Sequence, residues 1–214
     1  MGEMVLLSDS RIVATPSIEC GEPLVDLREI SALRVDGRYA APQGDYAHLR
    51  AGVVDRLVLA QTLLPSEYKF LVIEGYRPMA LQTHIFEQCV ERMRLQSPDA
   101  EEAELRRLAS RFVSPPEVAP HVAGAAVDLT LSTVDGVELW MGSKVNDTDT
   151  PACFTAAHDI GADARLRRDL MGQALNGAGL VNYPTEWWHW SYGDRYWAYS
   201  TGAAAARYGP FIHQ

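Results

Sequence analysis

The sequence has few cysteines, no long apolar run and no recognisable secretory signal. Its three cysteines, Cys20, Cys89 and Cys153, are widely spaced and form no CxxC pair, which favours reduced thiols over a structural set of disulfides. No stretch approaches the roughly 18 consecutive apolar residues of a membrane-spanning helix. Residues 1–17 contain no basic start followed by an apolar run. We therefore expect a cytoplasmic protein without a membrane-spanning segment.

Basic residues are also scarce: 19 Lys and Arg stand against 28 Asp and Glu, which gives a net charge of −9. Binding to nucleic acid or to an anionic membrane surface requires a basic footprint, so we expect neither partner. A negative surface is compatible with a cationic or zwitterionic small substrate. The simpler interpretation is that the charge keeps the protein in solution.

The chain has the length of one domain, which we expect to span residues 1–214. Hydrophobic residues make up 47% and charged residues 22%, a composition typical of folded proteins of a size that needs no disulfide or metal ion merely to fold. Residues 1–45 are rich in Pro, Gly and polar side chains. They predict an irregular N-terminal segment with short strands that packs on the core.

Apolar periodicity and turn residues predict the order of helices and strands. Helices are expected over residues 46–64, 79–96, 99–112 and 163–178, and strands over residues 69–74, 125–131, 186–192 and 195–199. The last two strands are expected to pair around Gly193 and Asp194. The inner face of the second helix is expected to carry Leu81, Ile85, Cys89 and Met93. Because helices and strands do not strictly alternate, we expect an α+β fold with a mainly antiparallel central sheet and flanking helices.

Two of the six histidines lie in unusual settings. His121 precedes a predicted strand that contains Asp128, and His189 lies among tryptophans late in the chain. Two imidazoles and one carboxylate are a common ligand set for a catalytic zinc ion that keeps a fourth position for water. The alternative is that His121 is an ordinary loop residue, that His189 lies in an aromatic core and that Asp128 pairs with a charged side chain. Burying Asp128 in an apolar run is costly without a charged or metal partner, so both interpretations stay open on these grounds.

Glu186 stands three residues before His189. A carboxylate beside a metal-bound water can take its proton and pass it to a leaving amine. The neighbouring Trp187 and Trp188 would limit access of solvent and raise the basicity of this carboxylate. The alternative is a glutamate at a strand edge that faces water.

Arg77 follows a buried strand and precedes the rigid Pro78. Its planar, permanently charged guanidinium can stabilise a developing oxyanion. The alternative is a buried structural arginine that pairs with Glu74 or with an acid of the following helix. The residues alone do not separate these two roles.

Three short motifs occur in a fixed order: GYRP at 75–78, HVAGAAVD at 121–128 and EWWH at 186–189. Together they resemble the zinc D-alanyl-D-alanine dipeptidases of the vancomycin-resistance type, which belong with D,D- and L,D-carboxypeptidases and hedgehog-like zinc folds. The resemblance covers roughly residues 46–200. It implies one Zn²⁺ per chain with His121, Asp128 and His189 as ligands. It further implies that Glu186 is the catalytic base and Arg77 the transition-state stabiliser.

The chain departs from this family pattern where the substrate is expected to bind. Ala119 stands two positions before the first ligand, where the family usually has a small hydroxyl residue. Asn146, followed by Asp147, stands after Met-Gly, where the family tends to have an acid that holds the substrate ammonium group. The candidate substrate contacts are therefore Ala119, Asn146 and Asp147, with Trp187 and Trp188 as walls of the pocket. The departures concern specificity for D-Ala-D-Ala and leave the zinc machinery intact.

The resemblance implies zinc-dependent hydrolysis of a D-amino-acid dipeptide, with D-Ala-D-Ala as the first choice. A dipeptidase needs a closed pocket, and the loops at residues 30–45 and 142–160 are candidates for closing it. One alternative is a D,D- or L,D-carboxypeptidase that acts on longer peptidoglycan peptides. Others are a non-catalytic zinc-containing binding module, against which the presence of both Glu186 and Arg77 argues, and a metal-free protein. A small dipeptide is the expected partner, and monomer and homodimer both stay open.

Overall fold

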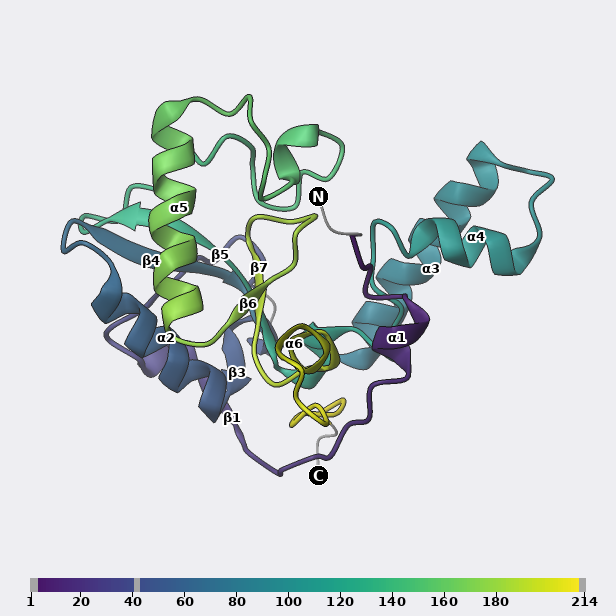
Figure 1. Ribbon diagram of the computed structural model, residues 1–214, viewed down its shortest axis with the longest axis horizontal. Helices are drawn as coiled ribbons and strands as arrows, with labels where there is room; N and C mark the ends of the chain where they lie inside the picture. The colour runs from purple at the N-terminus through teal and green to yellow at the C-terminus, as the bar shows by residue number, and fades with distance from the viewer. Residues whose placement is uncertain (1–3, 41–42, 212–214) are drawn as a thin grey trace.

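A five-stranded sheet crosses the middle of the molecule in the computed structural model, which describes residues 4–40 and 43–211 (Figure 1). Its strands, in spatial order, are β2 (Arg34–Val35), β4 (Tyr68–Glu74), β5 (Ala126–Thr133), β7 (His189–Ser191) and β6 (Val181–Asn182). β2 runs parallel to β4, and the other neighbours are antiparallel. The predicted α+β fold with a mainly antiparallel sheet is confirmed.

Two helices, α2 (Ala51–Leu63) and α5 (Ala162–Gly177), pack against each other and against one face of this sheet (Figure 1). The alternation of side chains along β5 explains the packing. Val127, Leu129 and Leu131 lie in the main hydrophobic core with residues of both helices. Because successive strand residues point to opposite faces, Asp128 projects from the face of the sheet that these helices leave open.

The N-terminal segment, for which short strands were expected, contains short helical turns as well as short strands. They are α1 (Ser10–Val13), β1 (Leu24–Asp26), η1 (Leu27–Glu29), β2 and η2 (Asp45–Ala47). β1 pairs antiparallel with β3 (His48–Arg50) in a second, two-stranded sheet. Leu27 and Leu33 are buried in the main core. Residues 1–3, 41–42 and 212–214 of the expected domain lie outside the described residues.

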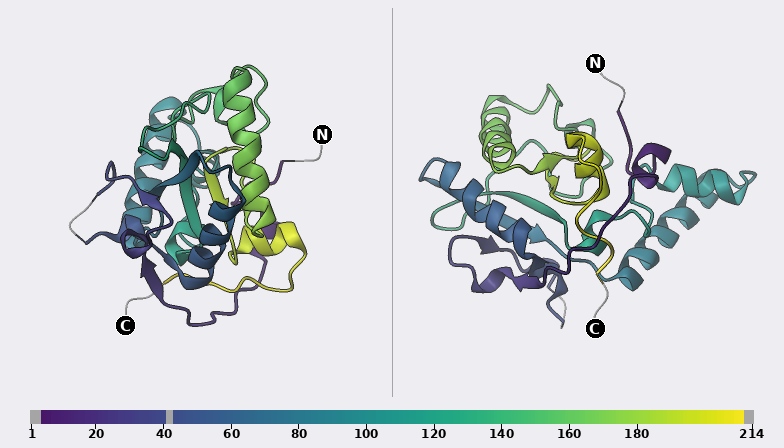
Figure 2. Two further views of the ribbon diagram at one scale, coloured as in Figure 1. Left: turned by 90° about the vertical axis from the view of Figure 1, so that its left-hand side faces the viewer. Right: turned by 60° about the horizontal axis from the view of Figure 1, so that its bottom comes forward.

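Helices α3 (Met79–Gln96) and α4 (Glu102–Ala109) pack together and project away from the sheet (Figure 1; Figure 2, right). The predicted inner stripe of α3 is wrong in part: Cys89 and Met93 are buried, but Leu81 is 46% exposed. The buried side instead follows Gln82, Phe86 and Val90. Periodicity locates a stripe only approximately, and here contact with α4 fixes which residues are covered.

The predicted strand at 195–199 is wrong, because these residues belong to helix α6 (Arg195–Thr201). Asp194 caps this helix by accepting hydrogen bonds from the backbone N–H groups of Tyr196 and Trp197. An aspartate at this position satisfies N–H groups that have no partner inside the helix, which outweighs the strand preference of aromatic residues.

The boundaries of other elements also differ from the prediction. The expected helix at 46–64 begins with η2 and β3, so α2 starts only at Ala51. The helix expected at 99–112 is the shorter α4, and the strand expected at 186–192 is confined to β7. The remaining short helical turns are η3 (Pro120–Ala123) and η4 (Pro151–Cys153). Among the described residues, no helix has both the length and the apolar character that crossing a membrane requires.

Candidate metal and catalytic site

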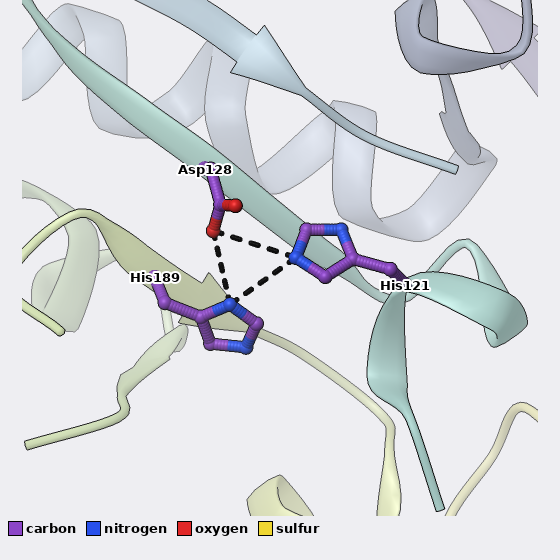
Figure 3. Close-up of side chains that lie close together, drawn as sticks. All are labelled: His121, Asp128 and His189. Carbon is purple, nitrogen blue, oxygen red and sulfur yellow. Dashed lines mark hydrogen bonds and ion pairs between the residues drawn. The ribbon is translucent and has the colours of Figure 1, made fainter. Parts of the chain in front are cut away.

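The side chains of His121, Asp128 and His189 converge on one point (Figure 3). The distance from His121 Nε2 to His189 Nδ1 is 3.2 Å, and that from His189 Nδ1 to Asp128 Oδ1 is 3.0 Å. The third side of the triangle, from His121 Nε2 to Asp128 Oδ1, is 3.4 Å. All three residues are buried. The structure thus brings together the three ligands expected from the sequence.

The register of the sheet explains why two of these residues meet. Asp128 on β5 lies directly opposite His189 on β7 and, on its other side, opposite Glu74 on β4. Directly opposed residues of antiparallel strands project from the same face. One row across three strands therefore carries Glu74, Asp128 and His189.

His121 reaches the same point from the short turn η3, just before β5. Gly124 ends this turn in the left-handed conformation, with φ of 63°. This conformation favours glycine, and a Cβ atom at this position would also force the side chain of Leu24 to shift, because it would lie 2.5 Å from Leu24 Cδ2. The turn directs the chain into β5 while His121 stays beside Asp128.

The donor set fits a divalent metal ion. A tetrahedral zinc ion with bonds of about 2.0–2.1 Å separates its ligand atoms by about 3.3–3.4 Å, close to the spacing found here. His121 Nδ1 lies 2.7 Å from the carbonyl oxygen of Gly75, and a carbonyl only accepts hydrogen bonds. Nδ1 therefore carries the proton and Nε2 keeps its lone pair for a metal ion.

The electrostatics of the three residues favour a charged carboxylate. Burial by itself raises the pKa of Asp128, but the charges and hydrogen bonds of His121 and His189 outweigh it and hold that pKa below its usual value. Burial lowers the pKa of His121, whereas Asp128 raises it, and the net shift is upward. Protons therefore compete with a metal ion for this site when the pH falls.

Glu186 faces the cavity into which the three candidate ligands open. Burial raises its pKa to about 7, with His189 and Arg77 opposing the rise and Asp128 adding to it. A carboxyl group with this pKa exchanges its proton near neutral pH, as a general base and acid must.

An amide side chain that the sequence analysis missed fixes the turn that carries Glu186. Asn182 Nδ2 donates to the carbonyl oxygens of Glu186, at 3.1 Å, and His189, at 3.0 Å. The backbone N–H of His189 donates to the carbonyl of Glu186 at 3.1 Å. The sequence offered one signal for this role, a polar residue shortly before the EWWH motif. The hydrogen-bond partners of its side chain, however, depend on the folded turn.

Arg77 lines the same cavity and is held by two neighbours. Its Nε and Nη2 donate to the two carboxylate oxygens of Glu74, at 2.7 and 2.6 Å, and its Nη1 donates to Gln82 Oε1 at 2.7 Å. Burial lowers the pKa of Arg77, but Glu74 outweighs it and raises that pKa. Arg77 therefore pairs with Glu74, as the structural alternative expected, and also lines the cavity. Sequence analysis missed Gln82, whose Nε2 donates to the carbonyl of Ser114 at 2.7 Å.

The cavity has a volume of about 1270 Å³. Of the expected substrate contacts, Ala119 and Asn146 line it. Asp147, Trp187 and Trp188 are not among its lining residues, and the two tryptophans are 1% and 0% exposed. The tryptophans lie in the main core.

The two loops expected to close the pocket touch each other across its edge. Asn146 Nδ2 donates to the hydroxyl of Tyr39 at 3.0 Å. Both residues line the cavity. The contact joins the segment at 30–45 to the segment at 142–160.

The chain is similar to known peptidases along most of its length. The family model described as D-ala-D-ala dipeptidase matches residues 24–206. The D-alanyl-D-alanine dipeptidase of Synechocystis sp. (strain ATCC 27184 / PCC 6803 / Kazusa) is 29% identical over 219 aligned residues, which cover 87% of this chain and 88% of the relative.

Two solved structures are similar at low identity. The LD-carboxypeptidase LdcB matches with a TM-score of 0.50 and 16% identity, covering 86% of this chain and 75% of its own. A mutant of the vancomycin-resistance D,D-pentapeptidase VanY, in complex with Zn(II), matches with a TM-score of 0.42 and 14% identity, covering 79% and 89%. The likeness to LdcB concerns the fold.

Proposed function

The chain belongs to the D-ala-D-ala dipeptidase family, and from this premise we propose that it hydrolyses free D-alanyl-D-alanine with a zinc ion held by His121, Asp128 and His189. Membership makes the chain a metallopeptidase with a peptidoglycan-related substrate. The observation that carries the finer proposal is the convergence of three buried ligand atoms beside Glu186 in one cavity.

Glu186 acts as the proton carrier of the reaction. A zinc ion, when bound, supplies a water molecule of lowered pKa and polarises the scissile carbonyl. Glu186 accepts the proton of the attacking water and delivers it to the nitrogen of the leaving amino acid. Its pKa of about 7 allows both transfers near neutral pH. The products are two free alanines.

Arg77 stabilises the negative oxygen that develops when water attacks the carbonyl. Three of its N–H groups are bonded to Glu74 and Gln82, and a guanidinium has five. Two donors are therefore left for the reacting oxygen, and the bonded ones fix the orientation of the group in advance. A donor that needs no reorganisation contributes most to the rate.

A second candidate function is supported by the size of the cavity. Small-molecule pockets usually measure about 300–1,000 Å³, and this cavity measures about 1270 Å³. It extends along the start of α3 to Leu81 and Ile85 and includes Phe112 beyond α4. This space suits a longer peptide that ends in D-Ala, as a D,D- or L,D-carboxypeptidase would bind.

Metal analysis and a comparison of substrates test both proposals. We expect one zinc ion per chain in the purified protein and a higher kcat/KM for free D-Ala-D-Ala than for an N-acylated peptide ending in D-Ala-D-Ala. The variant E186A should keep the zinc ion and lose nearly all turnover. Absence of bound metal would refute the zinc proposal. A higher kcat/KM for the longer peptide would favour the carboxypeptidase.

A further inference from the structure

Four acidic residues line the cavity within the described ranges: Asp45, Glu74, Asp128 and Glu186. The proposed substrate, a free dipeptide, brings an α-ammonium group into this space. A buried or half-buried ammonium group needs a carboxylate partner. The question is which of the four acids is available to it.

Three of these acids already have a role. Glu74 is bonded through both oxygens to Arg77. Asp128 contacts both histidines and is a candidate metal ligand. Glu186 is the proposed proton carrier. Among the described residues, the carboxylate of Asp45 has no hydrogen bond or ion pair, and it is half-buried at the cavity wall.

Hydrogen bonds link the segment of Asp45 to one of the candidate metal ligands. The carbonyl oxygen of the next residue, Tyr46, accepts the N–H of Gly75 at 2.6 Å. The carbonyl of Gly75 in turn accepts Nδ1–H of His121 at 2.7 Å. Two hydrogen bonds therefore link the segment of Asp45 to a metal ligand. A Cβ atom at Gly75 would lie 2.5 Å from the carbonyl oxygen of His48, so the contact is as close as glycine allows.

The electrostatics agree with this placement. The pKa of Tyr76, which lines the cavity, is raised first by burial and further by the negative charge of Asp45. Across the cavity edge, Asn146 is neutral and already donates to Tyr39. Asp147 is not a lining residue. No acid on the 142–160 side of the described cavity wall is therefore placed to hold an ammonium group.

We propose that Asp45 binds the α-ammonium group of the substrate and makes the enzyme prefer free dipeptides over N-acylated peptides. The proposal rests on the proposed dipeptidase function and names the residue that sets its specificity. An N-acyl group removes the positive charge, so Asp45 would gain nothing from such a substrate and would lose contact with water.

The test compares D-Ala-D-Ala with N-acetyl-D-Ala-D-Ala in the wild type and in D45N. A hydrogen bond to a charged group contributes about 1.5–3 kcal/mol, so kcat/KM of D45N for the free dipeptide should fall about 10- to 100-fold. Its kcat/KM for the acetylated dipeptide should stay within about twofold of the wild-type value. D149N, which changes an exposed aspartate outside the cavity, is the matched control.

A binding measurement separates recognition from turnover. In the E186Q background, D45N should weaken calorimetric binding of D-Ala-D-Ala by the same factor and leave binding of the acetylated form unchanged. Equal melting temperatures of D45N and the wild type would establish that the variant folds, and D45S provides a second substitution at the same position.

The outcomes are distinct. An unchanged ratio of the two substrates in D45N, or loss of the preference in D147N instead, overturns the role of Asp45 while the dipeptidase stands. A wild-type preference for the acetylated dipeptide also overturns it and supports the carboxypeptidase. If the wild type with bound zinc cleaves neither substrate, the proposed function fails, and the inference fails with it.

Discussion

Replacement of Glu186 by glutamine should stabilise the metal-free protein at alkaline pH. The pKa of Glu186 is about 7 in the folded chain, against an ordinary value of 4.5. The folded state therefore binds this proton more tightly than the unfolded state does. The stabilisation by the protonated carboxyl is fully present below pH 4.5 and is lost as the pH rises through about 7.

The difference between 4.5 and about 7 corresponds to about 3 kcal/mol. Because Glu186 faces the cavity and keeps partial contact with solvent, this is an upper value. A neutral glutamine of the same shape avoids the cost of an ionised group in this position. E186Q should therefore exceed the wild type in free energy of unfolding at pH 8 and match it at pH 4.

Urea unfolding of both proteins, freed of metal by a chelator, measures this difference at each pH. Both proteins share their other titratable groups, so the comparison isolates Glu186 together with its electrostatic coupling to Asp128. The same variant with zinc restored should lose about 10²- to 10⁴-fold in kcat, as removal of a general base does. Equal free energies of unfolding at pH 8 would refute the view that Glu186 is held in a site that disfavours its charge.

Three further variants test other parts of the site. R77A should lower kcat by about 10²-fold with little change in KM, if its guanidinium acts on the transition state; a change in KM alone would assign it to substrate binding. D128N should lower zinc content, measured by elemental analysis, because an amide is a weaker ligand than a carboxylate; full occupancy would exclude it as a ligand. Arg168 is buried and donates to three carbonyl oxygens of the segment 141–154. R168M should therefore lower the free energy of unfolding by at least about 2 kcal/mol in urea titrations, and an unchanged value would show that the segment is held by other contacts.

The candidate ligands were accessible from the sequence because each lies in a distinctive local setting. A carboxylate within an apolar strand, as at Asp128, signals a partner of opposite charge. The sequence did not indicate that Asp128 lies opposite both His189 and Glu74, because strand register depends on pairings between distant segments. The groups that hold the site, Gln82 and Asn182, were missed for the same reason. The hydrogen bonds of amide side chains leave no periodic pattern in the sequence.

The error at α6 has a different origin. Residues 195–199 are aromatic and fit a strand by composition, yet Asp194 supplies a cap for the first turn of a helix. The capping signal was present in the sequence, but the prediction gave more weight to the aromatic composition. The inner face predicted for α3 was wrong in part for another reason. No local signal shows that Phe86 and Val90 are buried, because their burial depends on contact with α4.

The row of Glu74, Asp128 and His189 explains how the fold tolerates so much charge in one place. Each acid of the row has a cationic or imidazole partner: Arg77 for Glu74, and His121 and His189 for Asp128. Breaking one buried pair leaves its partner uncompensated, which costs more than the pair contributes when intact. The candidate metal ligands and the proposed oxyanion stabiliser therefore depend on one another through the sheet. A substitution at Glu74 would disturb Arg77 directly and would also reach the candidate metal ligands, because the charge of Glu74 acts on His121 and that of Arg77 interacts with Asp128.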